Sequence, residues 1–116
     1  IVRGKTGLIG RISEVSANYA TVMLVNDHNS RIPVITSNSK VRGILTKQGN
    51  HLKLIYLKNN HDATNGEVIY TSGDGKLYPK GIAVAVISKI TNEGAFVQSI
   101  ENFNDLEYAV VESKAN

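Results

Sequence analysis

The side chains of this chain that could support nucleophilic chemistry are one serine–aspartate loop and three histidines. Ser72-Gly73-Asp74-Gly75 has the residue types of the Gly-Asp-Ser-Gly nucleophile loop of chymotrypsin-like proteases, but here the serine precedes the aspartate. A catalytic triad also needs an imidazole within hydrogen-bond reach of the serine hydroxyl and a carboxylate that orients the imidazole. The candidate partners are His28, His51, His61, Asp27, Asp62 and Asp105. Because His28 and His61 stand in polar turns typical of solvated side chains, we expect no catalytic residues; a β-barrel hydrolase with an unrecognised active site is the alternative.

Metal and phosphate chemistry have equally little support. The histidines lack the short spacings of metal ligands, and the chain has no cysteine, which excludes zinc–thiolate sites and disulfides. Gly4-Lys5-Thr6 matches the end of a P-loop without the glycine that must precede it. The glycines at positions 4, 7 and 10 are better explained by a close approach of two backbones. We therefore expect no metal and no cofactor.

The charge of the chain does not favour nucleic acid as a partner. Its 116 residues carry 13 basic and 10 acidic side chains, for a net charge of +3, and the basic residues form no block. Lys53, Tyr56 and Lys58 are the one place where an aromatic residue lies between basic ones, and we expect Tyr56 to be a core residue with its hydroxyl at the rim. No apolar run reaches the roughly 20 residues that span a bilayer.

The composition predicts an all-β fold. Val, Ile and Thr together number 31 residues and Leu and Ala together 16, while 12 Asn and 10 Gly supply turn chemistry. Branching at Cβ restricts rotamers in a helix and suits a pleated strand. We expect about nine strands, with Pro33 at a sheet edge because it cannot donate a ladder hydrogen bond. Their ranges are 7–15, 20–25, 32–35, 41–46, 52–57, 67–71, 82–87, 95–100 and 106–110.

Several segments, in their order and spacing, resemble one protein family. They are Gly7-Leu8-Ile9-Gly10-Arg11-Ile12, Val22-Met23-Leu24-Val25-Asn26-Asp27, Ile32-Pro33-Val34, Val41-Arg42-Gly43-Ile44-Leu45, the run from Gly66 to Gly75, Tyr78-Pro79-Lys80-Gly81-Ile82-Ala83-Val84-Ala85 and Leu106-Glu107-Tyr108-Ala109-Val110-Val111. Together they resemble the extracytoplasmic β-domain of MreC, the bacterial rod-shape-determining family, over residues 4–112.

This resemblance implies a fold and an organisation for the chain. The fold is two small packed β-barrel-like subdomains, one of them chymotrypsin-like without a catalytic triad. Residues 1–116 would form one MreC-type β-domain, with the boundary between the subdomains left open. In the family a membrane helix and a coiled coil precede this domain, and we expect both to be absent from this chain.

The resemblance also implies a function that is not enzymatic. The domain would be a scaffold of the cell-elongation machinery on the periplasmic side of the bacterial inner membrane, where it maintains rod shape during peptidoglycan synthesis. It would bind and position a class B penicillin-binding transpeptidase, and it would associate with MreD, MreB and other elongation-complex proteins. Self-association is a further expectation, and the membrane anchor would lie in the upstream segment.

For the partner-binding surface, we expect large apolar side chains that stand next to turns. Such side chains are hard to bury fully, and aromatic residues are common anchors in protein interfaces. The candidates are Leu77, Tyr78, Phe103 and Tyr108. A partner could also add a strand to an exposed sheet edge, and a domain that prefers one conformation of an enzyme shifts the enzyme toward it.

Overall fold

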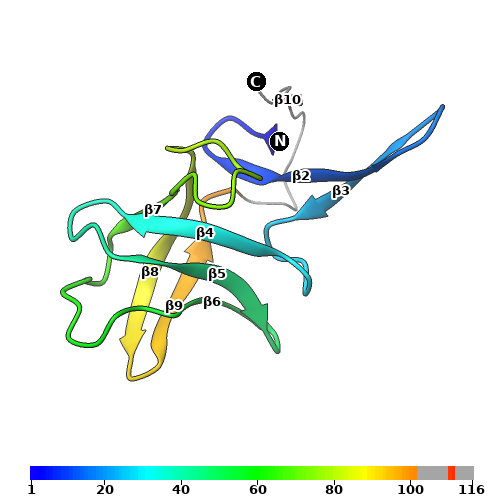
Figure 1. Ribbon diagram of the computed structural model, residues 1–116. Helices are drawn as coiled ribbons and strands as arrows, with labels where there is room; N and C mark the ends of the chain where they lie inside the picture. The colour runs from blue at the N-terminus through cyan, green and yellow to red at the C-terminus, as the bar shows by residue number, and fades with distance from the viewer. Residues whose placement is uncertain (102–109, 112–116) are drawn as a thin grey trace.

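The structure, a computed structural model, describes residues 1–101 and 110–111, and every regular element among them is a β-strand. The strands form a four-stranded antiparallel sheet in the order β10-β1-β2-β3 and a closed barrel in the order β4-β5-β6-β9-β8-β7 (Figure 1). Their bounds are Val2–Arg3 (β1), Leu8–Val15 (β2), Ala20–Leu24 (β3), Arg31–Thr36 (β4), Arg42–Gln48 (β5), His51–Ile55 (β6), Val68–Thr71 (β7), Ala83–Thr91 (β8), Gly94–Ser99 (β9) and Val110–Val111 (β10). The all-β prediction is confirmed. Within the described residues, no helix has the length and apolarity to cross a membrane.

The barrel owes its core to the alternation of side chains along its strands. In β4, Ile32, Val34 and Thr36 are buried and the residues between them are not. Leu45, Leu54 and Ile69 supply fully buried side chains from three further strands. Each such side chain contributes about 1.5–3 kcal/mol on burial, so the closed barrel is the stable body of the protein.

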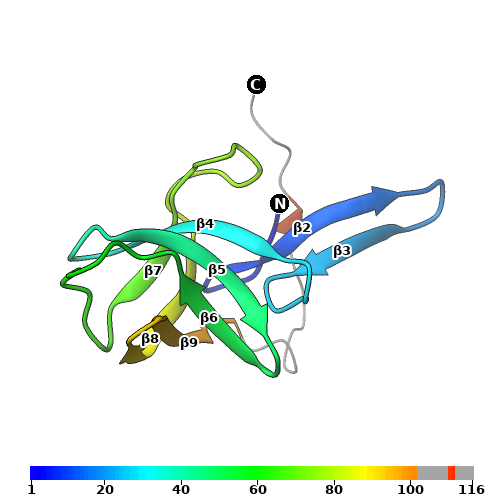
Figure 2. The same ribbon diagram turned by 60° about the horizontal axis from the view of Figure 1, so that its bottom comes forward.

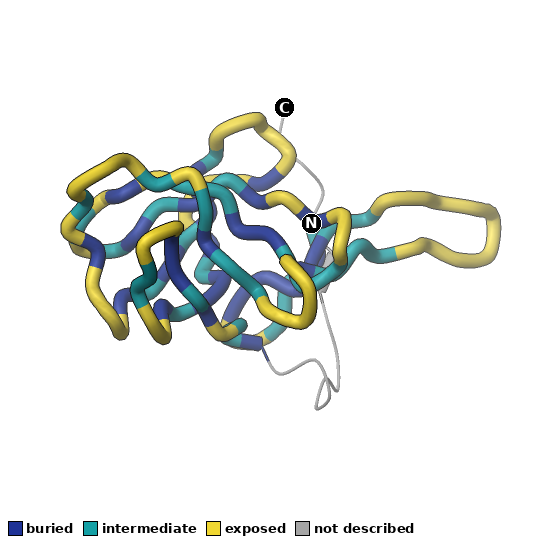
Figure 3. The backbone as a smooth tube through the Cα atoms, turned by 90° about the horizontal axis from the view of Figure 1, so that it is seen from below, coloured by how far each residue is buried: buried dark blue, intermediate teal, exposed yellow. Residues whose placement is uncertain are grey.

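The four-stranded sheet carries an arm that extends beyond this body. The β2–β3 hairpin begins against the core at Leu8 and Ile9, which are buried. In its far half, residues 13–21, the side chains are exposed and the two strands contact only each other. Figures 2 and 3 show the hairpin leaving the barrel, with the outer part of both strands and the connecting turn exposed. The arm therefore owes little of its stability to packing against the barrel.

The first loop of the chain links the sheet to the end of β9. The carboxylate of Glu101 accepts hydrogen bonds from the backbone N–H of Thr6 at 2.8 Å and of Gly7 at 2.9 Å. A Cβ on Gly7 would lie 2.5 Å from the carbonyl oxygen of Ala83, and a Cβ on Gly10 would lie 2.1 Å from that of Met23. The expected close approach of backbones is confirmed at Gly7 and Gly10, whereas a Cβ on Gly4 would meet the side chain of Glu101.

Two details differ from the sequence expectations. Pro33 does not lie at a sheet edge, because β4 pairs with β5 on one side and with β7 on the other. The carbonyl of Pro33 accepts a hydrogen bond from the N–H of Ser72, just past the last β4–β7 pair. Since proline has no N–H, the ladder lacks one hydrogen bond at this position. The short strand β1 was not expected. Most of the predicted strand 106–110 lies outside the described residues.

Candidate functional site

The four residues expected to contact a partner have different surroundings. Leu77 is 56% exposed in the loop between β7 and β8. The neighbouring Tyr78 is 3% exposed and belongs to the hydrophobic core, contrary to the expectation that an aromatic residue beside this turn stays at the surface. Burial raises the pKa of the Tyr78 phenol, against the opposing effect of Arg11 and Ser30. Phe103 and Tyr108 lie outside the described residues.

The serine–aspartate loop is engaged in a local turn. The Ser72 hydroxyl donates to Oδ2 of Asp74 at 2.8 Å, and the N–H of Asp74 returns a bond of 3.3 Å to the same hydroxyl. His61 uses Nδ1 to accept from the N–H of Ala63. Across residues 1–101 and 110–111, no hydrogen bond joins Ser72 to a histidine, and no three His, Cys, Asp or Glu side chains gather as metal ligands would. Nothing here assembles a nucleophile with its base.

A second buried carboxylate, Glu67, organises two loops of the barrel. It accepts hydrogen bonds from the backbone N–H groups of Asn38, Ser39 and Thr64 at 2.8–2.9 Å and from the Ser39 hydroxyl at 3.0 Å. Burial alone would raise the pKa of Glu67, but these hydrogen bonds outweigh it and lower the pKa to about 2. A carboxylate saturated by protein donors has no free oxygen for acid–base work, so Glu67 is a structural residue.

A groove of about 230 Å³ lies between β6 and the β8–β9 turn. It forms because β6 and β9 pair at only two positions, Lys53 with Phe96 and Leu54 with Ala95. Beyond that point Tyr56 adopts φ 63°, which turns the chain out of β6. Gly94 has φ 152°, and a Cβ there would lie 2.0 Å from the carbonyl oxygen of Leu54, so this approach requires glycine.

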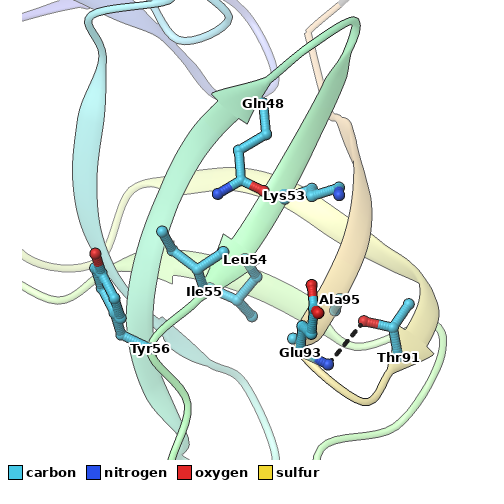
Figure 4. A pocket seen from close by; sticks show the side chains of 9 residues that line it. Gln48, Lys53, Leu54, Ile55, Tyr56, Thr91, Glu93 and Ala95 are labelled. Carbon is cyan, nitrogen blue, oxygen red and sulfur yellow. Dashed lines mark hydrogen bonds between the residues drawn. The ribbon is translucent and has the colours of Figure 1, made fainter.

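The groove combines polar groups of both charges with an exposed aromatic ring. Figure 4 shows Gln48 and Lys53 toward one end, Glu93 and Thr91 toward the other, and Tyr56 at the side. Tyr56 is 78% exposed, so the expectation that it is a core residue is wrong. A positive φ is a strained conformation for a bulky non-glycine residue, and such strain is concentrated at functional sites. Tyr56 is therefore an exposed aromatic held in a costly backbone conformation.

Next to the groove, basic and aromatic side chains meet on the outer face of β6 and β9. The ammonium of Lys53 lies 4.8 Å from the centroid of the Phe96 ring, and the imidazole of His51 meets the same ring edge-on at 5.3 Å. Phe96 is half-buried between the buried Ala95 and Val97, so it stands outside the barrel. We call this surface the β6–β9 face and define it by His51, Lys53, Tyr56, Glu93 and Phe96. Sequence reasoning missed it because its residues come from two segments that lie about 40 positions apart in the sequence.

Comparison with known proteins identifies relatives over the whole fold. The family model described as "Rod shape-determining protein MreC, barrel core" matches residues 1–113. A cell shape-determining protein MreC from Caulobacter vibrioides is 37% identical over 89 residues, which is 76% of this chain and 26% of that protein. The chain thus spans about a quarter of the length of that relative.

Solved structures agree with this match. MreC from Pseudomonas aeruginosa superposes with a TM-score of 0.73 at 30% identity, over 83% of this chain and 66% of that one. MreC from Helicobacter pylori, solved in a complex with a penicillin-binding protein (PBP2), superposes with a TM-score of 0.69 over 94% of this chain and 75% of that one. At 14% identity, this second likeness concerns the fold alone.

Proposed function

The chain belongs to the MreC family of rod shape-determining proteins, and from that membership we propose that it is a non-catalytic scaffold domain that binds and positions a class B penicillin-binding transpeptidase. Its place would be the periplasmic side of the bacterial inner membrane, within the cell-elongation machinery. The rest of a longer protein would supply the membrane anchor and contacts with MreD and MreB. The Helicobacter pylori relative, which was solved with a penicillin-binding protein, supports a partner of this class.

The observation that carries the proposal is the β6–β9 face. It offers a half-buried Phe96 with a cation above its ring, an exposed Tyr56, and a groove with an amide, an ammonium and a carboxylate. Protein interfaces are enriched in aromatic residues and are rimmed by polar groups that make directional hydrogen bonds. The rigid barrel beneath presents these groups without a cost in chain ordering, which favours binding.

The candidates expected from the sequence, Leu77, Phe103 and Tyr108, remain a second proposed set of partner-binding residues, of which Leu77 alone lies within the described residues; Tyr78 is buried. Leu77 lies on the loop that enters β8 at Ala83, whereas the groove of the β6–β9 face lies at the other end of β8, beside the turn that follows Thr91. The two surfaces are thus separable by mutation. The β6–β9 face is preferred because it combines a groove, an aromatic cluster and a strained residue, whereas the described part of the other surface offers one exposed leucine.

The test is binding of the chain to the immobilised extracytoplasmic region of a class B penicillin-binding protein. We expect Phe96→Ala to weaken binding at least about tenfold, which corresponds to about 1.4 kcal/mol, while Leu77→Asp leaves affinity unchanged. Thermal unfolding of both variants checks that they fold. The reverse pattern would move the interface to the Leu77 loop, and no binding by the unmodified chain would contradict the proposed function.

A further inference from the structure

The outward-facing side chains of the barrel follow from the register of β4, β5 and β6, which lie side by side (Figure 1). Ile32, Leu45 and Leu54 are directly paired across these three strands, and all three are fully buried. Side chains alternate between the two faces of a strand, and residues paired across a ladder share a face. The residues one position before and after these three therefore point out of the barrel.

One row of these outward positions is apolar. Pro33 pairs with Ile44, and Ile44 pairs with Ile55. Each of the three is half-buried although it points away from the core. Directly paired side chains have Cβ atoms about 4.5–5.5 Å apart, so the three make one continuous strip across three strands. We call Pro33, Ile44 and Ile55 the apolar row.

The neighbouring row, about 7 Å away along the strands, carries two cations. Arg31 pairs with Thr46, which pairs with Lys53. Nη1 of Arg31 donates to the hydroxyl of the buried Thr46 at 3.3 Å, and this hydroxyl donates to the carbonyl of Ser30 at 3.0 Å. Lys53 is held by the ring of Phe96 at 4.8 Å. Both cations are therefore fixed along one line beside the apolar row.

Neither cation is neutralised within the described part of the chain. No carboxylate there lies within ion-pair distance of Arg31 or Lys53. Arg42, by contrast, pairs with Asp74 at 4.0 Å on the far side of the apolar row. Glu93 shares the groove with Lys53 but lies toward its other end (Figure 4). The surface thus presents an apolar row with unbalanced positive charge along one edge.

We propose that the transpeptidase-binding surface extends from the β6–β9 face across β5 to β4, and that it receives a segment of the partner with acidic side chains along one edge and aliphatic side chains along the other. This inference rests on the proposed function and names the chemistry of the segment that binds. The acidic edge pairs with Arg31 and Lys53, while the aliphatic edge covers the apolar row. Covering that row removes water from the ion pairs, which strengthens them, and opposite charges also speed the encounter. Continuity with the β6–β9 face through Lys53 favours the transpeptidase over an anionic lipid surface.

The charged row is tested at Arg31, which lies outside the β6–β9 face. Binding to the immobilised extracytoplasmic region of a class B penicillin-binding protein is compared for Arg31→Glu and Lys80→Glu. Lys80 is exposed in the Leu77 loop, so its variant has the same change of net charge at another place. We expect Arg31→Glu to weaken binding at least about tenfold and Lys80→Glu to change it less than about twofold. Added salt should weaken binding of the unmodified chain and affect Arg31→Glu less, because salt screens exposed charges.

The apolar row has its own matched pair of variants. Ile44→Thr places a hydroxyl in the row, and Val86→Thr makes the same kind of change at an outward, half-buried position of β8. We expect Ile44→Thr to weaken binding at least about threefold and Val86→Thr to leave it unchanged. Thermal unfolding checks that all four variants fold, and the salt dependence of the unmodified chain needs no variant.

The outcomes separate this inference from the proposed function. Full affinity of a folded Arg31→Glu or Ile44→Thr variant, while Phe96→Ala still binds weakly, would overturn the inference and leave the proposed function standing. So would an equal loss in Arg31→Glu and Lys80→Glu, or binding of the unmodified chain that does not respond to salt. Phosphatidylglycerol vesicles that bind the unmodified chain but not Arg31→Glu, while both bind the transpeptidase equally, would assign the surface to lipid instead. No binding of the unmodified chain to the transpeptidase would contradict the proposed function itself.

Discussion

The backbone N–H of Gly7 donates a hydrogen bond of 2.9 Å to Oε1 of Glu101, across 94 positions of the sequence. Thr6 donates to the same oxygen, so one carboxylate holds the loop between β1 and β2 against the end of β9. Gly4 packs on the same group, since a Cβ there would lie 2.3 Å from Oε1. This contact joins the four-stranded sheet to the barrel.

Removing that carboxylate should loosen the joint. Glu101→Ala leaves two backbone donors unsatisfied, and we expect the free energy of unfolding to fall by about 2–3 kcal/mol. Glu101→Gln keeps an acceptor of the same size and should cost about half as much. Urea unfolding of both variants measures the difference. If Glu101→Ala and the unmodified chain had the same free energy of unfolding, this contact would not contribute to stability and the prediction would be wrong.

Glu67 should make stability depend on pH in the acid range. Its pKa is lowered from 4.5 to about 2 in the folded protein, so folding favours the carboxylate form. A lowered pKa contributes stability that is fully present above pH 4.5 and is lost as the pH falls through about 2.

The measurement is the free energy of unfolding between pH 2 and pH 6. We expect Glu67→Gln to have lower stability at neutral pH and a flatter acid branch than the unmodified chain. Glu101, whose pKa is also lowered, stays intact in this variant and accounts for a remaining slope. An unchanged acid branch in Glu67→Gln would remove Glu67 as its cause.

Replacement of Tyr56 should affect the stability of the chain and its binding to the transpeptidase in different ways. Its φ of 63° suits asparagine better than tyrosine, and the side chain is exposed, so little packing is lost on replacement. We expect Tyr56→Asn to leave the free energy of unfolding unchanged or raise it by up to about 1 kcal/mol. Binding to the transpeptidase should nevertheless weaken. A destabilised variant, or one with full affinity, would show that Tyr56 is not held in this conformation for binding.

The sequence was most informative where one local pattern decides the structure. The apolar run 82–87 predicted a strand covered on both faces, and most of its residues are buried in β8 or just before it. The turn residues between strands were equally informative. Strands and turns of this kind depend on residues that are adjacent in the sequence, so one sequence is enough to predict them.

What the sequence could not supply depends on residues that meet from distant segments. Tyr78 looked like a surface residue beside a turn, but closure of the barrel and its junction with the sheet cover its ring. Tyr56 looked like part of an alternating strand, and only its backbone conformation takes it to the surface. Lys53 stacks on Phe96, and the two residues are paired in the ladder although they lie 43 positions apart in the sequence, so no local pattern indicates the contact.

The most direct test of the account is amide hydrogen exchange of the chain with and without the extracytoplasmic region of a class B penicillin-binding protein. The account predicts slower exchange in residues 51–56 and 93–96 when the transpeptidase is present, with little change at the Leu77 loop. Slower exchange confined to the Leu77 loop or the β2–β3 arm, or none anywhere at saturating transpeptidase, would contradict it.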